Sequence, residues 1–424
     1  MSTRESRFAA FVEGLIGVAG HADRGEPLRE YCTGLLLPGE RKSVEPMAAR
    51  IEPSRVSARH QAMHHFVATA AWSDGAVLAA ARAWALPAIE RAGPIRAWIV
   101  DDTGFVKKGK HSVGVARQYC GAVGKTENCQ VAVSLAVVNE AASLPIGFRL
   151  YLPEDWAADP VRREKAGVPA EATFQTKPEI AVSQIRGALA AGVPKGVVLA
   201  DAGYGNETAF RDELSALGLR YAVGVLSTTT VWGPGTGPLP AKRWSGRGRP
   251  PTRLRRDPAH QPVSVKALAL ALPANSFRTV TWRAGAAGYL RSRFAAVRVR
   301  AAHRDENRTA PRAEEWLLIE WPPGESAPSK YVLSTLPADT PLKRLVATVK
   351  QRWRIERDYQ ELKQEIGLDH YEGRGWRGFH HHATLSIAAY GFLIADSSAS
   401  RTPIPAHRGQ HSGDRGQFLT VVQA

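Results

Sequence analysis

The sequence predicts an α/β protein in which an N-terminal helical domain is followed by a core that a β-rich insertion interrupts. Residues 1–90 carry helical patterns, and short apolar runs typical of strands begin near residue 93. Helices and strands then alternate up to residue 225, after which residues 226–334 return to strand-like patterns rich in Pro, Gly and Arg. A chain of 424 residues is long enough for two or three domains with a large core.

The N-terminal helical domain is expected to span residues 1–90. Its helical patterns cover Phe8–Ile16, Pro27–Leu36, Ser57–Phe66 and Ser73–Ala85, and Ser73 or Asp74 is a suitable cap for the last of them. Basic residues are frequent between Arg41 and His60. This domain is therefore expected either to bind DNA or to form a helical shoulder packed on the core.

The first part of the core is expected at residues 91–225. The strand-like runs Ile95–Asp101, Gly114–Tyr119 and Gln130–Val138 suit a three-stranded antiparallel meander. They are followed by helix Pro178–Ala191, strand Val197–Asp201, helix Glu207–Leu217 and strand Arg220–Val225. Three strands followed by alternating helices and strands is the ribonuclease-H-like order, in which the first and fourth strands are neighbours. Asp101 and Asp201 would then meet.

The remaining chain is expected to hold the insertion at 226–334, the second part of the core at 335–395 and a disordered tail at 396–424. Strand-like runs in the insertion cover Phe277–Arg283, Phe294–Arg300 and Trp316–Trp321. The next helix begins with Thr340 as N-cap and Pro341 as its first residue, and it carries Glu356. A last apolar helix is expected at Ala383–Ala395.

Three acids form the candidate active site. Asp101 and Asp201 each end a buried strand, at the edge where open α/β sheets place their sites. Together with the helical Glu356 they could coordinate two metal ions about 4 Å apart, as in enzymes that cleave phosphodiesters. Each Asp alone could equally be a turn or N-cap residue. The three acids together favour the metal site.

The segment Thr348–Leu368 is expected to be one helix. Arg352, Glu356 and Lys363 recur at spacings that place them on one helical face. The carboxylate would bind metal while the two cations hold phosphates. The alternative is a solvated face with ion pairs one helical turn apart.

The chain resembles DDE transposases of bacterial insertion sequences, in the family named after insertion sequence 701. The residues that carry the resemblance are Asp101-Asp102-Thr103-Gly104-Phe105 with Lys107, Lys108 and Gly109, then Gln118-Tyr119-Cys120-Gly121, Asp201-Ala202-Gly203-Tyr204-Gly205, and Arg352, Glu356 and Lys363. The wider superfamily shows a Tyr-Arg-Glu-Lys signature, whose Tyr position falls on Val349 here. One phosphate-contacting hydroxyl is therefore absent.

The resemblance implies a ribonuclease-H-like core that cuts transposon ends and joins them to target DNA by a cut-and-paste route. It implies two Mg²⁺ ions, which Mn²⁺ can replace, held by Asp101, Asp201 and Glu356. It also implies a homodimer on DNA, bound to terminal inverted repeats and to target DNA. Family members place Ser or Thr two residues after the catalytic Asp, so Thr103 favours Asp101, with Asp102 as the alternative.

Several basic residues are candidate DNA contacts. Arg352 and Lys363 would hold phosphates near the metals, and Lys107 and Lys108 follow the first acids, where a solvated turn is the alternative. The Arg-Gly-Arg-Pro stretch with Arg247 and Arg249 could lie in an A·T-rich minor groove, or be a flexible loop that touches phosphates only. The resemblance also implies that one aromatic residue of the insertion stacks on a flipped base, whereas most Trp of the insertion are expected to be core residues. The candidates are Trp232, Trp244, Trp282, Trp316 and Trp321.

Two further clusters are expected to have other roles. The run His380-His381-His382 is expected in a Gly-rich turn, where it would serve a structural or phosphate-binding role rather than a metal site. Cys32, Cys120 and Cys129 lack CxxC spacing and are too few for a disulfide framework.

The composition bounds the partners. Lys and Arg number 56 and Asp and Glu 40, which gives a net charge of +16 and a pI near 10. This excess favours nucleic acid. No apolar run is long enough to cross a membrane, and the charged N-terminus does not resemble a signal peptide, so a cytoplasmic, nucleoid-associated protein is expected. Alternatives to a transposase are a metal-dependent nuclease without strand transfer and a non-catalytic DNA-binding protein.

Overall fold

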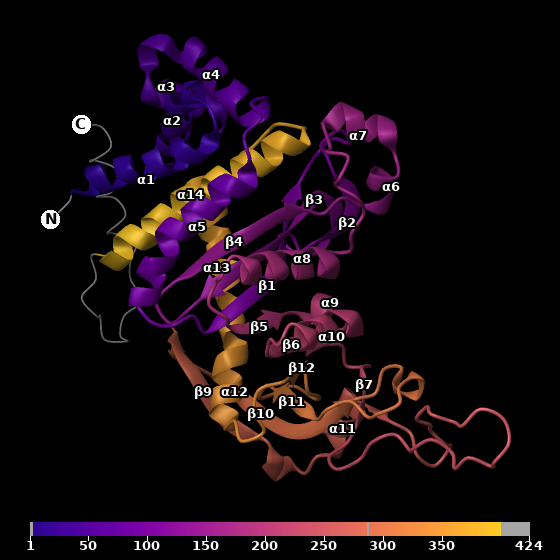
Figure 1. Ribbon diagram of the computed structural model, residues 1–424. Coiled ribbons are helices and arrows are strands. Elements are labelled where there is room, and N and C mark those ends of the chain that lie inside the picture. The colour runs from indigo at the N-terminus through magenta and orange to yellow at the C-terminus, as the bar shows by residue number, and fades with distance from the viewer. Residues whose placement is uncertain (1–2, 286–287, 400–424) are drawn as a thin grey trace. The chain divides into compact units, whose positions relative to one another are not determined.

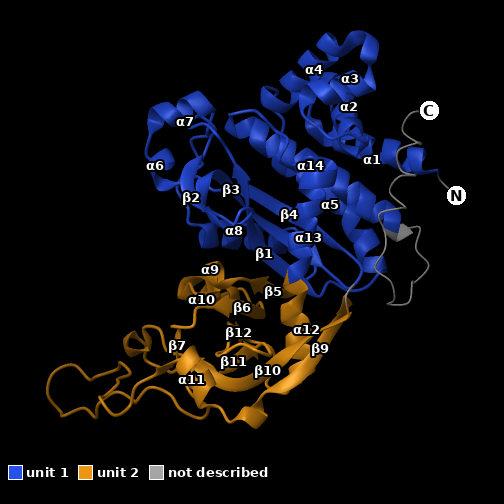
Figure 2. Ribbon diagram, turned by 180° about the vertical axis from the view of Figure 1, so that it is seen from behind, with its two compact units in different colours: residues 1–195, 353–424 blue, residues 196–352 orange. Residues whose placement is uncertain are grey.

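The computed structural model describes residues 3–285 and 288–399, which form two compact units (Figure 2). Unit 1 comprises residues 1–195 and 353–424, and unit 2 comprises residues 196–352. Both units combine helices with a sheet, so the predicted α/β class is confirmed. The predicted domain limits at residues 90, 225 and 334 lie within these units, and the ribonuclease-H-like assignment stays a prediction.

The N-terminal part of unit 1 is helical, as predicted. Its helices are α1 Arg4–Ala19, α2 Gly25–Leu36, α3 Val44–Ile51, α4 Val56–Ala68 and α5 Asp74–Arg91 (Figure 1). Ser73 caps α5, since its side chain accepts a hydrogen bond from the backbone N–H of Ala76 at 3.1 Å. The short helix α3 was not predicted. Helix α5 packs along the last helix, α14 Trp376–Ala399, which also contacts α2 and α4.

The sheet of unit 1 contains β1 Ala97–Val106, β2 Ala116–Cys120, β3 Lys125–Val138 and β4 Ser143–Leu150. All its described pairs are antiparallel, with β1 along one edge of β3 and both β2 and β4 along the other. The predicted meander is therefore wrong, because β3 lies between β1 and β2. Strand β4 was not predicted, since Pro145 and Gly147 weaken its strand signal. The pairing adapts by shifting register at Leu135/Ala136.

Helices cover both faces of this sheet. Helix α8 Lys177–Ala190 contacts β3 and β4, while α13 Trp353–Glu361 contacts β1 and β4. Helices α5 and α14 also pack on β4. The short helices α6 Glu154–Ala157 and α7 Pro160–Ala166 lie in the segment between β4 and α8. Because β1 and β3 are covered, residues 97–100 and 129–138 are almost entirely buried.

Unit 2 contains the strands from β5 to β12. Strand β5 Val197–Ala200 runs parallel to β6 Tyr221–Val225, and these strands frame α9 Ala202–Gly205 and α10 Thr208–Ala216, close to the predicted pattern. The sheet continues antiparallel through β12 Lys330–Ser334, β11 Glu315–Trp321 and β10 Gly288–Ala301. Strands β9 Arg278–Gly285 and β7 Thr230–Trp232 both pair with β10, and β8 Val263–Ser264 pairs with β7. Helix α11 Val265–Ala271 follows β8.

The segment expected to be one helix from Thr348 to Leu368 is interrupted twice. It consists of α12 Leu342–Val349, a 3₁₀ turn Lys350–Arg352, α13 Trp353–Glu361 and a π-helical turn Leu362–Ile366. The predicted cap is also shifted, because Pro341 is the N-cap and Leu342 the first helical residue. Since 3₁₀ and π turns change the rotation per residue, the regular spacing of Arg352, Glu356 and Lys363 does not by itself decide whether they share one face.

The last helix is longer than predicted. Helix α14 begins at Trp376 rather than Ala383, so the three His lie in a helix and not in a turn. The tail expected from residue 396 is also wrong at its start, because Asp396 is buried in α14 and accepts hydrogen bonds from Arg4 and Arg7. Residues 400–424 lie outside the described residues. Within the described ranges, no helix is long and apolar enough to span a membrane.

Candidate active site

Asp101 lies on the face of β1 that α13 covers. It is directly opposite Ser134 on β3, and residues paired in this way project from the same face. The Ser134 Oγ lies 2.7 Å from the hydroxyl oxygen of Tyr359, a residue of α13. Burial raises the pKa of Tyr359 well above its ordinary value, and the negative charge of Asp101 adds to this. Asp101 therefore shares a face of the sheet with the helix that carries Glu356.

Asp102 belongs to the opposite face. Its Oδ2 accepts a hydrogen bond at 2.6 Å from the Nζ of Lys177, the first residue of α8. The two side chains form a half-buried ion pair. Alternation along β1 thus places Asp101 and Asp102 on opposite faces, and Asp102 is engaged in an ion pair. The choice of Asp101 as the metal ligand stays a prediction.

Glu356 lies on the exposed side of α13. The residues that follow it include the buried Asp358, Tyr359 and Leu362. Asp358 is buried and accepts a hydrogen bond from the Ser143 hydroxyl, and its Oδ1 lies 3.1 Å from the hydroxyl oxygen of Tyr390. Burial raises the pKa of Asp358 to about 7. The Tyr390 hydroxyl donates to Glu361 Oε2 at 2.8 Å, and a phenol has only one proton to give. A protonated Asp358 that donates to Tyr390 satisfies all three groups.

Lys363 connects the π-helical turn to β1. Its Nζ donates to the backbone oxygen of Gly104 at 2.7 Å and lies 4.7 Å from the centre of the Phe105 ring. Burial lowers the pKa of Lys363. The ammonium group thus already has a protein partner three residues beyond Asp101, and it holds the segment that follows Glu356 against this strand. Its predicted contact with DNA phosphate stays a prediction.

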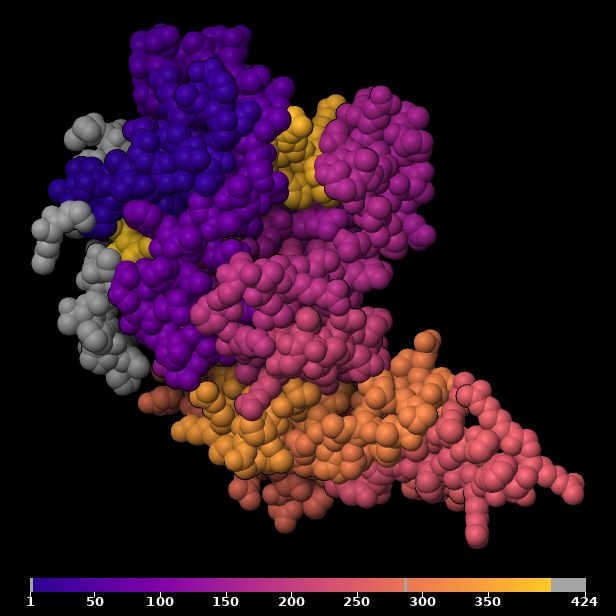
Figure 3. All heavy atoms as spheres, viewed as in Figure 1, coloured from indigo at the N-terminus to yellow at the C-terminus, as the bar shows by residue number. Residues whose placement is uncertain are grey.

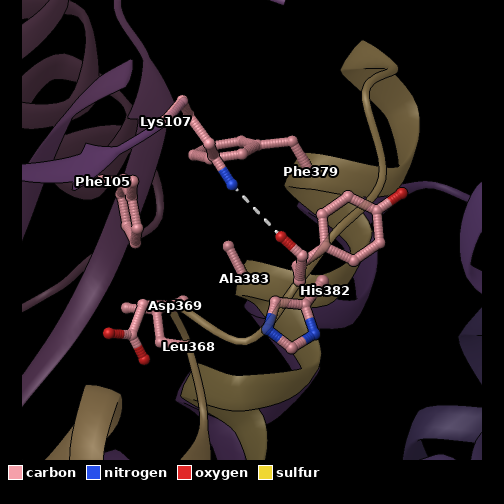
Figure 4. Close-up of a pocket in the computed structure, with 8 residues that line it drawn as sticks. Phe105, Lys107, Leu368, Asp369, Phe379, His382 and Ala383 are labelled. Atoms are coloured by element: carbon pink, nitrogen blue, oxygen red, sulfur yellow. Dashed lines mark hydrogen bonds between the residues drawn. The ribbon is translucent and has the colours of Figure 1, made fainter. Parts of the chain in front are cut away.

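Lys107 and Lys108 differ in exposure. Lys107 borders a small cavity with Phe105 and Phe379, and its Nζ donates to the backbone oxygen of Tyr371 at 3.2 Å, drawn as the dashed line in Figure 4. Burial lowers the pKa of Lys107. Lys108 is exposed. A DNA phosphate would therefore reach Lys108 more readily than Lys107.

Asp201 follows a strand and caps a helix. It follows β5 directly, and its Oδ1 accepts a hydrogen bond at 2.9 Å from the backbone N–H of Gly203, so it caps the short helix α9. Asp201 belongs to unit 2, whereas Asp101 and Glu356 belong to unit 1. The meeting of the three acids stays a prediction.

Arg352 ends the 3₁₀ turn, and the chain enters unit 1 at the next residue. Lys350, two residues earlier, is fixed within unit 2. Its Nζ lies 2.8 Å from both carboxylate oxygens of Glu320 and 4.2 Å from the centre of the Trp282 ring. The 3₁₀ turn that precedes the Glu356 helix is therefore fixed by Lys350, a contact that was not predicted from the sequence. The role of Arg352 as a phosphate clamp stays a prediction.

Arg247 and Arg249 are exposed on a loop of unit 2. The segment near residues 240–255 protrudes from the rest of this unit in Figure 3. Trp244 in the same loop is 51% exposed, and its Nε1 donates to the backbone oxygen of Gly248 at 3.2 Å. The other four candidate Trp are buried or half-buried against neighbouring side chains. Among the five, the structure leaves Trp244 most accessible.

The three consecutive His are buried and serve the fold. Both ring nitrogens of His381 lie about 3 Å from backbone oxygens of Val67 and Trp72, at 3.0 and 2.9 Å. His382 lies 2.9 Å from the Tyr31 hydroxyl and 3.0 Å from the Gly367 oxygen. Burial lowers the pKa of His381 and of His382 to about 4. Of the two roles predicted for the three His, structural or phosphate-binding, these contacts agree with the structural one.

The donor types suit a hard divalent cation. Asp101, Asp201 and Glu356 offer carboxylate oxygens, the ligands that Mg²⁺ prefers. In the part of the chain that the structure describes, no three His, Cys, Asp or Glu side chains are grouped closely enough to hold a metal ion. The chemistry of the three acids fits Mg²⁺.

Comparison with known proteins gives two findings. Residues 14–289 match the family described as DDE superfamily endonuclease. The chain is also 35% identical over 172 residues to a protein of Microchaete diplosiphon described as a probable transposase for insertion sequence element IS701. That match covers 40% of this chain and 42% of the relative, so the similarity spans less than half of either protein.

Proposed function

Because the chain belongs to the DDE superfamily of endonucleases, we propose that it is an insertion-sequence transposase, which cleaves the ends of its element and joins them to target DNA. The observation that supports this best is the placement of Asp101 on the sheet face covered by the Glu356 helix, with Ser134 and Tyr359 connecting strand and helix. The similarity to a protein described as a probable transposase supports the same proposal.

In this proposal the three acids bind metal ions and the basic residues bind DNA phosphates. Asp101, Asp201 and Glu356 would hold two Mg²⁺ ions, and Mn²⁺ could replace them. When bound, the ions would stabilise charge on the attacking and leaving oxygens of the phosphodiester. Arg352, Lys363 and Lys108 would bind phosphates near the cleaved bond, with Lys107 positioning the turn behind them.

DNA is the proposed partner, both as terminal inverted repeats and as target. The net charge of +16 supports a polyanionic partner. Arg247 and Arg249, with the exposed Trp244, would contact the DNA from a protruding loop. Two copies of the chain would pair the two ends in a cut-and-paste reaction.

The test compares three variants with a matched control. Asp101→Asn, Asp201→Asn and Glu356→Gln should each abolish Mg²⁺-dependent cleavage of DNA that carries the element's ends, while DNA binding persists. Asp102→Asn removes a neighbouring carboxylate from the other face and should retain cleavage. If Asp102→Asn abolishes cleavage and Asp101→Asn does not, the two roles are reversed.

Strand transfer separates the remaining alternatives. A transposase joins a 3′-hydroxyl end to a target plasmid, and gel analysis would show the joined product. Cleavage without this product would indicate a metal-dependent nuclease. Binding without cleavage in Mg²⁺ or Mn²⁺ would indicate a non-catalytic DNA-binding protein.

A further inference from the structure

The hairpin of β9 and β10 lies in a stretch of the chain that contains no acid. Residues 258–304 include no Asp or Glu, although the chain has 40 acidic residues. The same stretch contains seven Arg and one Lys, namely Lys266, Arg278, Arg283, Arg291, Arg293, Arg298, Arg300 and Arg304. Such a segment presents positive charge with no internal compensation.

The strand register divides these residues between two faces. Arg291 is paired with Thr281 and Arg293 with Thr279, so these four side chains share one face, called here the arginine face. The other face carries Val280, Ser292 and Phe294, which are at most 8% exposed. Phe294 packs edge-on against Trp282 on that side. One face of the hairpin is thus held in unit 2, and the arginine face is left to solvent.

Beyond Arg293 toward the tip, the hairpin is a ribbon of two strands. Strand β11 pairs with β10 from Arg293 onward, whereas β9 pairs with β10 as far as Gly288. Near the tip, Tyr289 is 71% exposed and Leu290 37%. Exposed apolar groups beside uncompensated arginines are typical of a binding surface.

The charges on the arginine face have no acidic partner. Among the described residues, Arg291 and Arg293 take part in no ion pair, while Arg256, Arg300 and Arg312 of the same unit do. Arg293 contacts the Trp321 ring instead, at 5.3 Å. Arg256, Arg300 and Arg312 are therefore neutralised by carboxylates within unit 2, whereas Arg291 and Arg293 have no carboxylate partner and can bind an external anion.

We propose that the arginine face is a docking surface for double-stranded DNA, with the two-stranded ribbon lying in the major groove. The major groove is about 12 Å wide and admits such a ribbon, and Arg and Thr are side chains that hydrogen-bond base edges there. The proposal rests on DNA being the partner of the chain. It differs from the loop with Arg247 and Arg249, whose sequence suits a minor groove.

The first experiment measures DNA binding by the full chain as a function of salt. Arg291→Gln combined with Arg293→Gln should weaken binding to a labelled duplex at least ~10-fold at 100 mM salt, and should reduce the slope of log K against log salt by up to about 2. Lys266→Gln combined with Lys330→Gln removes two exposed charges elsewhere in unit 2 and serves as control. The control should change affinity less than the ribbon variant.

A second variant keeps both arginines. Thr281→Glu places a negative charge on the exposed arginine face and should weaken binding to a similar extent, with unchanged thermal unfolding. Methylation of guanine N7, which lies in the major groove, should interfere with binding of the wild-type chain and cease to do so in the arginine variant.

The outcomes separate this proposal from the proposed function. If the chain binds and cleaves DNA but the ribbon variants behave like the lysine control, the docking surface is wrong and the transposase proposal stands. Weakened binding without any N7 interference would overturn the major-groove placement. If the wild-type chain binds no DNA, both proposals fail.

Discussion

At the residue scale, the contact between Ser134 and Tyr359 fixes the Glu356 helix against the sheet that carries Asp101. Ser134 lies on β3 opposite Asp101, and Tyr359 lies on α13 with Glu356. Their hydroxyl oxygens are 2.7 Å apart, and both residues are buried. Removing either hydroxyl leaves the other buried and unsatisfied, which costs about 1–3 kcal/mol.

Tyr359→Phe and Ser134→Ala should therefore each destabilise the protein by about 1–3 kcal/mol, and the double variant should cost less than the sum. Cleavage should fall further than DNA binding, because the Glu356 helix loses its registration against β1. Urea unfolding of the four proteins gives the coupling energy. Additive losses would show that the two hydroxyls do not interact.

Asp358 is predicted to make stability depend on pH. In the unfolded chain its carboxyl ionises near pH 4, whereas burial keeps it protonated in the folded protein up to about pH 7. The folded state thus binds more protons, so this contribution to stability is complete below pH 4 and is lost as the pH rises to 7. Asp358→Asn should remove that dependence and be relatively more stable at pH 8 than at pH 4.

Unfolding by urea at pH 4.5, 6 and 8 measures this effect. The difference between variant and wild type should change by of order 2–4 kcal/mol over the range. Glu365→Gln, an exposed acid of the same segment, is the control and should show no such change. Parallel pH profiles for Asp358→Asn and wild type would contradict the prediction.

At the scale of elements, the sequence predicted which segments are helices and strands better than how they are joined. The capping of α5 by Ser73 and the βαβ pattern of β5, α10 and β6 follow from local residue types, and the structure agrees. The order of β1, β2 and β3 does not, because strand pairing depends on long-range contacts. The interruptions around α13 leave no local signal either, since residues 342–366 keep a helical composition.

In the candidate site too, some residues could be predicted from local patterns and others could not. The sequence favours Asp101 over Asp102 because Thr103 follows it by two residues, and the structure places the two acids on opposite faces of β1. The anchors Tyr359, Asp358 and Lys350 could not be found, because a buried polar residue is recognised by its partners, and these lie far away in sequence. Lys363 is predicted to contact DNA phosphate, and its hydrogen bond to the backbone oxygen of Gly104 could not be predicted from the sequence.

The 3₁₀ turn before α13 is predicted to depend on Lys350. Its ion pair with Glu320 is mostly buried, so Lys350→Met leaves an uncompensated carboxylate and should lower stability by about 2–4 kcal/mol. Amide exchange in residues 350–356 should become faster. Lys350→Met with Glu320→Met should recover most of the stability. No recovery in the double variant would show that the lysine acts through another contact.

At the scale of the whole molecule, the candidate acids are divided between two units, with Asp201 in one and Asp101 and Glu356 in the other. If they form one metal site, each should contribute to metal affinity. Titration with Mn²⁺ followed by electron paramagnetic resonance should show weaker binding for Asp101→Asn, Asp201→Asn and Glu356→Gln alike, and unchanged binding for Asp102→Asn. Wild-type Mn²⁺ affinity in Asp201→Asn would place this residue outside the site.

The discontinuity of unit 1 has a consequence for synthesis on the ribosome. Strands β1–β4 emerge long before α13 and α14, which supply the cover for one face of their sheet. At 5–20 residues per second, the nascent chain needs roughly 10–40 s to extend from residue 195 to residue 399. During that interval Ser134 lacks its hydroxyl partner and the apolar face of β4 is exposed. A chain stalled before residue 353 should be sensitive to protease within unit 1, and cleavage activity should arise only after α14 is made.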